Sequence, residues 1–218
     1  MAHPYLFLVK FFELIGLGHF AQSYPHVIYS WFVVLLLIVL AYFGARTITM
    51  VPGKAQNFFE VVLSGMEEFM VDITGDEGRW FFPLIATLFL YIATCNLIGL
   101  IPGFFPPTAS INTTLSCALV TFTFTHFVGI KYHGIKYIKH FLGPIWWMTP
   151  IIFPIEVIGH MARIMSLSFR LFGNMMGHEL VLMILFVLAG AFFAPLPIMA
   201  MGIFVALVQA FVFFLLSI

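Results

Sequence analysis

Residues 153–180 read FPIEVIGHMARIMSLSFRLFGNMMGHEL. This apolar stretch contains six ionisable side chains: Glu156, His160, Arg163, Arg170, His178 and Glu179. Such groups are costly inside a membrane and therefore indicate a functional site by default. At 1.5 Å per residue, a helix from Glu156 to Glu179 is about 35 Å long, close to the thickness of a bilayer. The stretch predicts a spanning helix that carries polar groups from one membrane face to the other.

The composition of the whole chain indicates that lipid is its solvent. Of 218 residues, 62% are hydrophobic and only 8% are charged, whereas a soluble domain has about a quarter charged residues. Nine lysines and arginines balance nine aspartates and glutamates, so there is no basic excess for binding nucleic acid. Cys95 and Cys117 lie in apolar stretches, which predicts small core side chains rather than a disulfide or metal site. We expect neither a metal nor another cofactor.

The chain has enough apolar sequence for five membrane spans, each of which needs about 20 mostly apolar residues, and four charges interrupt the fourth of these stretches. The sequence therefore predicts an all-α integral membrane protein, with a single membrane domain over residues 1–218 and a long helical hairpin formed by the last two spans. Pro/Gly-rich segments at 101–107 and 191–197 predict the turns before the third and fifth spans. The predicted spans are 27–46, 80–101, 113–131, 150–186 and 197–218.

Positive charges predict the orientation of the chain, because short cytoplasmic loops are enriched in lysine and arginine. Arg46 and Lys54 follow the first span, and three lysines at 131, 136 and 139 follow the third. Both segments are expected in the cytoplasm, which places the N-terminus outside and the C-terminus inside. The apolar run at 7–15 is too short to span the membrane and is expected at the interface, not as a signal peptide.

Residues 54–76, between the first two spans, have an amphipathic pattern. Apolar residues recur there at helical spacing opposite several carboxylates, which predicts a helix along the cytoplasmic membrane surface. Six of the nine acidic residues of the chain fall within residues 60–77. This concentration fits either a solvated face or a docking surface for a protein partner.

Helical spacing of about 100° per residue gathers most polar groups of the 153–180 stretch on one face. That face contains Glu156, His160, Arg163, Ser166, Arg170, Asn174 and His178. Glu179 lies about 180° from Arg170 and must face other neighbours. Arg170 stays charged at physiological pH and needs a counter-charge if it is buried, yet Glu156 lies about 20 Å away along the helix. Either water in a cavity surrounds Arg170, or its counter-charge belongs to another polypeptide.

Four further polar residues each have two interpretations. Glu179 and His178 could pass protons, since both groups can titrate, or Glu179 could be a helix cap near the outer surface. Gln209 in the last span and Asn96 in the second could line an ion path or form hydrogen bonds between helices.

Histidines elsewhere in the chain give weaker signals. His126, His133 and His140 are seven residues apart, but haem ligation would need histidines that face each other across helices. A solvated cytoplasmic loop is therefore favoured for His133 and His140. His160 and Arg163 could line an aqueous exit, or their side chains could extend to the membrane–water interface.

At these residues the chain resembles subunit a of the F-type ATP synthase, of the bacterial type. The match around the arginine, SLSFRLFGNM at 166–175 followed by Glu179 and Leu180, is long and therefore specific. The resemblance extends from the first span to the end of the chain. Further matching segments are 96–103, 112–116, 154–156 and 207–213.

The resemblance implies a stator subunit that conducts protons, or Na+, across a bacterial inner membrane and has no catalytic activity alone. Its partners would be a ring of c subunits with membrane-embedded carboxyls and the b subunits of the peripheral stalk. Arg170 would face those carboxyls and prevent a direct leak, so that ion flow is coupled to ring rotation and ATP synthesis. The periplasmic half-channel would contain Glu179, His178, Gln209 and Asn96. The cytoplasmic half-channel, offset from it, would contain Glu156, Ser166 and Asn174.

Two positions depart from the family's pattern. The histidine that partners the glutamate from the last span is replaced by Gly202, while His178 directly precedes Glu179. We hypothesise that the imidazole serves the same place from another helix. An acid of the outer loop is replaced by Ser110.

Two other classes of protein compete with this one. A stand-alone ion channel or secondary transporter would be active as a purified chain, whereas the stator subunit needs its ring. The sequence has no fixed-period or inverted repeat, which argues against a self-contained transporter. An intramembrane protease or haem protein would need a serine–histidine pair or paired histidines at matching depth, and neither stands out.

Overall fold

The computed structural model describes residues 6–14, 18–46, 53–101, 103–134, 149–189 and 195–217. Every regular element in these ranges is helical, so the predicted all-α class is confirmed there. The α-helices are α1 (Phe7–Leu14), α2 (Gly18–Ser23), α3 (Pro25–Arg46), α4 (Lys54–Thr74), α5 (Phe82–Ile98), α6 (Ile111–His133), α8 (Thr149–Ala189) and α9 (Pro195–Ser217). Two short 3-10 helices are η1 (Asp76–Trp80) and η2 (Pro107–Ala109).

Four of the described helices are long and apolar enough to cross a membrane. They are Pro25–Gly44, Ile111–Tyr132, Ile152–Leu185 and Pro197–Ser217, which match the first, third, fourth and fifth predicted spans. Helix α5 is apolar but has 17 residues, so it is shorter than the predicted span at 80–101. It begins after η1, and it ends where Gly99 lies against the Pro106 ring so closely that a side chain would not fit. The chain must turn at that point.

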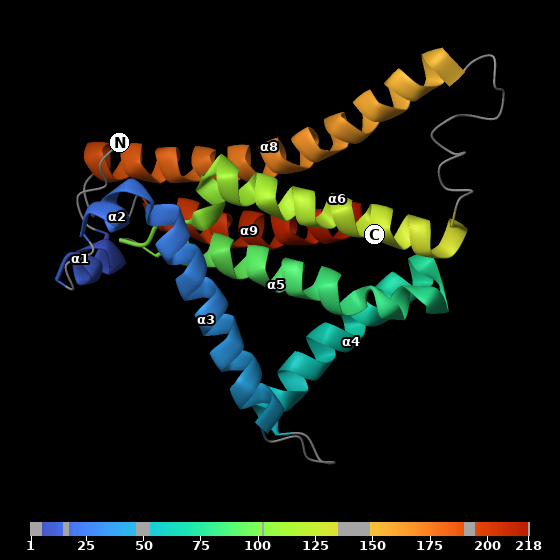
Figure 1. The fold of residues 1–218 in the computed structure, drawn as a ribbon. Coiled ribbons are helices and arrows are strands. Elements are labelled where there is room, and N and C mark those ends of the chain that lie inside the picture. Colours follow the sequence, from blue (N-terminus) through green and yellow to red (C-terminus); the bar gives the residue numbers. More distant parts are fainter. Residues whose placement is uncertain are drawn as a thin grey trace.

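Helices α5, α6, α8 and α9 form the central bundle, with α8 and α9 side by side and antiparallel (Figure 1). Their shared core contains Ile92, Ala93, Cys117, Ala118, Ile164, Leu167, Leu171, Ala210 and Phe213. Cys117 lies in this core, and Cys95 is fully buried in a neighbouring cluster, and neither forms a disulfide. The prediction that both cysteines are small core side chains is confirmed.

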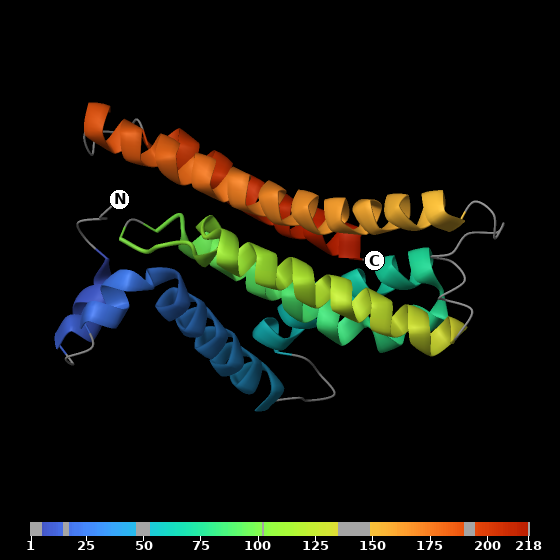
Figure 2. The same cartoon turned by 45° about the horizontal axis from the view of Figure 1, so that its top comes forward.

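Helix α8 is the element that positions the polar residues. Its 41 residues make a rod about 60 Å long, about twice the hydrocarbon thickness of a bilayer. The start of α8 diverges from α6, whereas its later part lies beside α9 (Figures 1 and 2). Its first half still contacts α6, since the His160 ring lies 5.8 Å from that of Phe122.

The predicted amphipathic helix is present as α4, which packs its apolar side against α5 and α9. Met70 is buried with Ile85 and Phe214, and the Phe69 ring lies 5.8 Å from that of Phe211. Exposed carboxylates occupy the other side, among them Glu60, Glu68 and Asp72. Amphipathicity thus produces an internal contact as well as a polar surface.

The end of the bundle near the N-terminus brings together elements that are far apart in the sequence (Figure 1). At one end lie α1, α2, the α5–α6 connection, the end of α8 and the start of α9 (Figure 1). The predicted interfacial run at 7–15 is helical there as α1. Lys136, Lys139, His140 and most of the predicted turn at 191–197 lie outside the described residues.

Candidate functional site

A cavity of about 600 Å³ opens between α6, α8 and the end of α9. The polar face of α8 lines it with Glu156, His160, Arg163, Ser166 and Arg170. Thr121, Thr125 and His126 of α6 and Ser217 of α9 complete its polar lining. The predicted polar face is therefore confirmed for these five α8 residues, which share one cavity.

Arg170 is exposed at one end of this lining. Within the described part of the chain, its guanidinium forms no ion pair and no hydrogen bond. Glu156 lines the same cavity, but 14 residues earlier, about 20 Å along the helix. The prediction that Arg170 has no acidic partner in its own helix is confirmed. Its charged group lines the cavity between α6, α8 and α9.

A histidine pair lies at the other end of the same cavity. His160 Nδ1 lies 2.8 Å from the Glu156 carbonyl oxygen and 3.7 Å from its carboxylate. The ring centre of His126 on α6 is 5.1 Å from that of His160. Sequence reasoning missed this pair because it grouped His126 with His133 and His140. No group of three or more metal-binding side chains occurs in the described residues.

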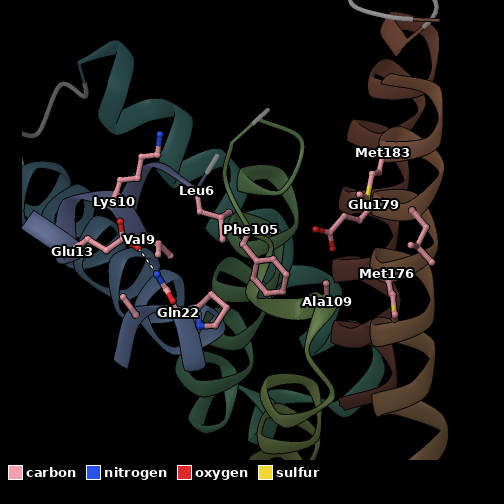
Figure 3. A pocket seen from close by; sticks show the side chains of 13 residues that line it. Leu6, Val9, Lys10, Glu13, Gln22, Phe105, Ala109, Met176, Glu179 and Met183 are labelled. Carbon is pink, nitrogen blue, oxygen red and sulfur yellow. Dashed lines mark hydrogen bonds between the residues drawn. The ribbon is translucent and has the colours of Figure 1, made fainter. Parts of the chain in front are cut away.

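Glu179 lines a second cavity, of about 940 Å³, on another side of α8. Its carboxylate points away from α8 towards Phe105 of the α5–α6 connection (Figure 3). Helix α8 continues to Ala189, so Glu179 is inside the helix and the interpretation as a helix cap is wrong. The two cavities share no lining residue among those described.

His178 faces a different neighbour from Glu179, because adjacent helical residues point about 100° apart. Its Nε2 lies 3.2 Å from the Ile198 carbonyl oxygen of α9. A carbonyl only accepts hydrogen bonds, so Nε2 carries the proton in this contact. A Cβ atom on Gly202 would overlap the imidazole of His178 and the side chain of Leu100. The ring therefore fills the space that a side chain at position 202 would need.

Amide side chains form hydrogen bonds between the packed elements of the bundle. Asn174 donates from Nδ2 to Gln209 Oε1 at 2.7 Å, which joins α8 to α9. Buried Asn96 donates to the Ala206 carbonyl oxygen at 3.4 Å and accepts a 2.7 Å hydrogen bond from Thr108. Gln209 and Asn96 thus act as interhelical hydrogen-bonding groups.

Two expected groupings are not brought together directly. Asn174 does not line the cavity of Glu156 and Ser166, because it lies one turn beyond Arg170, where α9 packs on α8. His178, Gln209 and Asn96 do not line the cavity that contains Glu179. Sequence reasoning also missed Thr114, whose hydroxyl lies 3.0 Å from that of Ser168.

The fold and the site define a multi-pass helical membrane protein with ionisable groups in two separate cavities along one long helix. The family model described as "ATP synthase A chain" matches residues 27–218, and the chain belongs to this family. It is therefore a non-catalytic membrane-sector subunit, with a part in proton transport and ATP synthesis.

Full-length relatives agree with this assignment. The chain is 71% identical over 218 residues to the ATP synthase subunit a of Desulfosudis oleivorans, covering 100% of this chain and 95% of the relative. It is 57% identical over 228 residues to that of Syntrophobacter fumaroxidans and 56% identical over 218 residues to that of Geotalea daltonii. Both matches also cover 100% of this chain and 95% of the relative.

Proposed function

We propose that the chain is the stator half of a rotary ion path, in which Arg170 faces the carboxyls of a c-subunit ring. Protons, or Na+, would enter through one cavity, travel on the ring and leave through the other. The b subunits of a peripheral stalk would hold the chain still while the ring turns. Ion flow would then be coupled to rotation and to ATP synthesis.

The single observation that carries this proposal is the separation of the two cavities along α8. Arg170 and Glu179 are nine residues apart on one helix, yet they line different cavities with no described residue in common. Two aqueous regions that do not join cannot form a simple pore. They are useful when a moving carrier collects an ion from one and delivers it to the other.

The charge of Arg170 explains how such a carrier would be directed. A neutral, protonated carboxyl can face lipid, whereas an ionised carboxyl needs an opposite charge nearby. A guanidinium does not lose its proton at physiological pH, so Arg170 attracts the ionised form without conducting protons itself. A ring carboxyl would therefore release its proton on reaching Arg170 and take up another before moving back into lipid.

The proposed path residues divide between the two sides of the membrane. Glu179 would belong to the periplasmic side, together with His178, Gln209 and Asn96, whose hydrogen bonds link the helices. Glu156 and Ser166 lie on the cytoplasmic side with Arg170. Asn174 would lie at the boundary between the periplasmic and cytoplasmic sides, since it donates a hydrogen bond to Gln209.

The topology that fits this proposal has five spans in a bacterial inner membrane, with α5 as the second. Helix α4 would lie along the cytoplasmic surface, with the N-terminus in the periplasm and the C-terminus in the cytoplasm. The predicted span bounds, 27–46, 80–101, 113–131, 150–186 and 197–218, remain part of this proposal. The cavity of Glu179 would then open to the periplasm, and that of Glu156 to the cytoplasm.

Reconstitution with and without the ring tests the proposed function. The purified full chain in liposomes should pass protons at the rate of lipid alone, because neither cavity crosses the membrane. The complete complex should acidify the same vesicles when ATP is added, as read from a pH-sensitive dye. Proton flux through the chain alone would instead support a stand-alone channel or transporter.

A helix-exchange experiment tests the role of His178. Replacing His178 with alanine should slow ATP-driven pumping by about tenfold, since it removes a proton-accepting group beside the path. The double substitution His178→Gly, Gly202→His places an imidazole in the same space from α9 and should restore part of the rate. Wild-type pumping by His178→Ala would overturn the hypothesis.

Gly202→Ala alone should destabilise the chain by about 1–3 kcal/mol, because the added methyl group overpacks the space that the His178 ring fills. Thermal unfolding in detergent measures this loss of stability.

A further inference from the structure

Helices α1 and α2 lie outside the 27–218 region that the family model matches, yet they are packed firmly onto the bundle. Val9 and Ala21 are buried against Ile28 and Tyr29 of α3. The Leu8 amide donates to the Tyr29 hydroxyl at 3.4 Å, and this hydroxyl donates to the Gly103 carbonyl oxygen at 3.3 Å. The two helices are therefore fixed to the connection between α5 and α6.

This packing makes α1 and α2 one wall of the Glu179 cavity. Across the cavity from Glu179, the wall presents Lys10, Glu13 and Gln22 (Figure 3). Gln22 of α2 donates to the Glu13 carboxylate of α1 at 2.6 Å, so this bond holds the two helices together at the cavity wall. The wall thus places three polar side chains, among apolar ones, across the cavity from a carboxylate.

Glu13 and Glu179 are the two carboxylates among the described residues that line this cavity. The α5–α6 connection contributes Phe105 and Ala109, and residues 99–111 contain no aspartate or glutamate. Glu13 is exposed, and Lys10 lies three residues away on the same helix face. A proton reaching Glu179 from this side passes a site that already has a negative group at its outer wall.

We infer that α1 and α2 form the outer wall of the ion entrance and that Glu13 collects protons for Glu179. This inference rests on the proposed function. A proton from the solution binds the Glu13 carboxylate, moves through water in the cavity to the Glu179 carboxylate, and leaves Glu13 ionised again. The Glu13 carboxylate also attracts cations locally, beside the opposite charge of Lys10 on the same wall.

Substitution of Glu13 in the complete complex tests the collecting role. Glu13→Gln should slow ATP synthesis driven by a proton gradient by about three- to tenfold at low ionic strength. The loss should grow as the pH on the entrance side rises, because protons become scarcer there. Glu13→Asp should keep most of the rate, and Glu68→Gln, an exposed acid of α4 outside this cavity, should match wild type. Equal rates for Glu13→Gln and wild type at every pH would overturn the inference.

Chemical blocking of the wall gives a second test that does not depend on the Glu13 variant assembling. Cys95 and Cys117 are buried, so an introduced surface cysteine can be modified selectively. A bulky, membrane-impermeant thiol reagent should inhibit the Gln22→Cys complex, whose cysteine lines the cavity, and leave His19→Cys active. His19 is exposed on the same helix but does not line the cavity. Labelling of Gln22→Cys without inhibition would contradict an entrance at this wall.

Comparison with Glu179→Gln separates the two proposals. Suppose that Glu179→Gln stops conduction while Glu13→Gln and labelled Gln22→Cys behave as wild type. The entrance inference then fails and the proposed function stands. If Glu179→Gln conducts normally, the proposed function itself fails.

Discussion

Replacing Arg170 with alanine is expected to abolish both ATP-driven proton pumping and ATP synthesis in the assembled complex. Its guanidinium lines an open cavity and forms no ion pair in the described part of the chain, so its charge is available to a partner's carboxylate. Opposite charges about 4 Å apart attract by about 4 kcal/mol at an effective dielectric constant of about 20. Because 1.4 kcal/mol is about tenfold, both activities should fall by about 10²- to 10³-fold. Dye quenching on ATP addition and ATP formation under an imposed gradient measure the two directions.

Two matched variants show whether the position or only the charge of Arg170 matters. Arg163→Ala removes the same charge from the same cavity, about 10 Å earlier along α8, and should keep pumping and synthesis coupled. Arg170→Lys keeps the charge but loses the planar guanidinium, which binds carboxylates through two parallel hydrogen bonds, so it should retain less activity than Arg163→Ala. Coupled activity in Arg170→Ala, or equal losses in Arg163→Ala, would overturn the assignment of the ring-facing charge.

The fold could be predicted from sequence wherever a single physical variable decides it. The length of apolar sequence between charges located α3, α6 and α9 to within a few residues, and the long apolar stretch that four charges interrupt located α8. The same variable overestimated α5, because its ends depend on η1 and on the close approach of Gly99 to Pro106. Contacts between segments that are apart in sequence leave no local signal.

The site shows the same division between local and long-range information. Helical periodicity placed Glu156, Arg163 and Arg170 on one face and Glu179 on the opposite side, because one helix fixes their relative directions, and in the structure these sides line different cavities. It could not show that Asn174 would bond Gln209, since that contact depends on how α9 packs against α8. The pairing of His126 with His160, and the wall that α1 and α2 form beside Glu179, also depend on packing between distant elements.

Replacing Glu179 with glutamine is expected to stop proton movement through the larger cavity while leaving the chain folded. Glutamine keeps the size of the side chain but cannot take up and release a proton. Loss of a positioned proton-transfer group costs about 10²- to 10⁴-fold, so we expect at least about a hundredfold loss of ATP-driven pumping. Passive conduction through the membrane sector should fall equally, because both processes use the same side of the path.

A control for this substitution comes from Met176, which lines the same cavity about one helical turn away. Met176→Gln introduces the same amide but keeps the carboxylate, so its pumping rate should stay close to wild type. Glu179→Asp keeps a carboxylate on a shorter side chain and should retain part of the rate. Together these variants separate loss of the titrating group from a change in the polarity of the cavity. Equal losses in Glu179→Gln and Met176→Gln would assign the effect to packing, and normal conduction in Glu179→Gln would mean that protons reach the ring without passing this carboxylate.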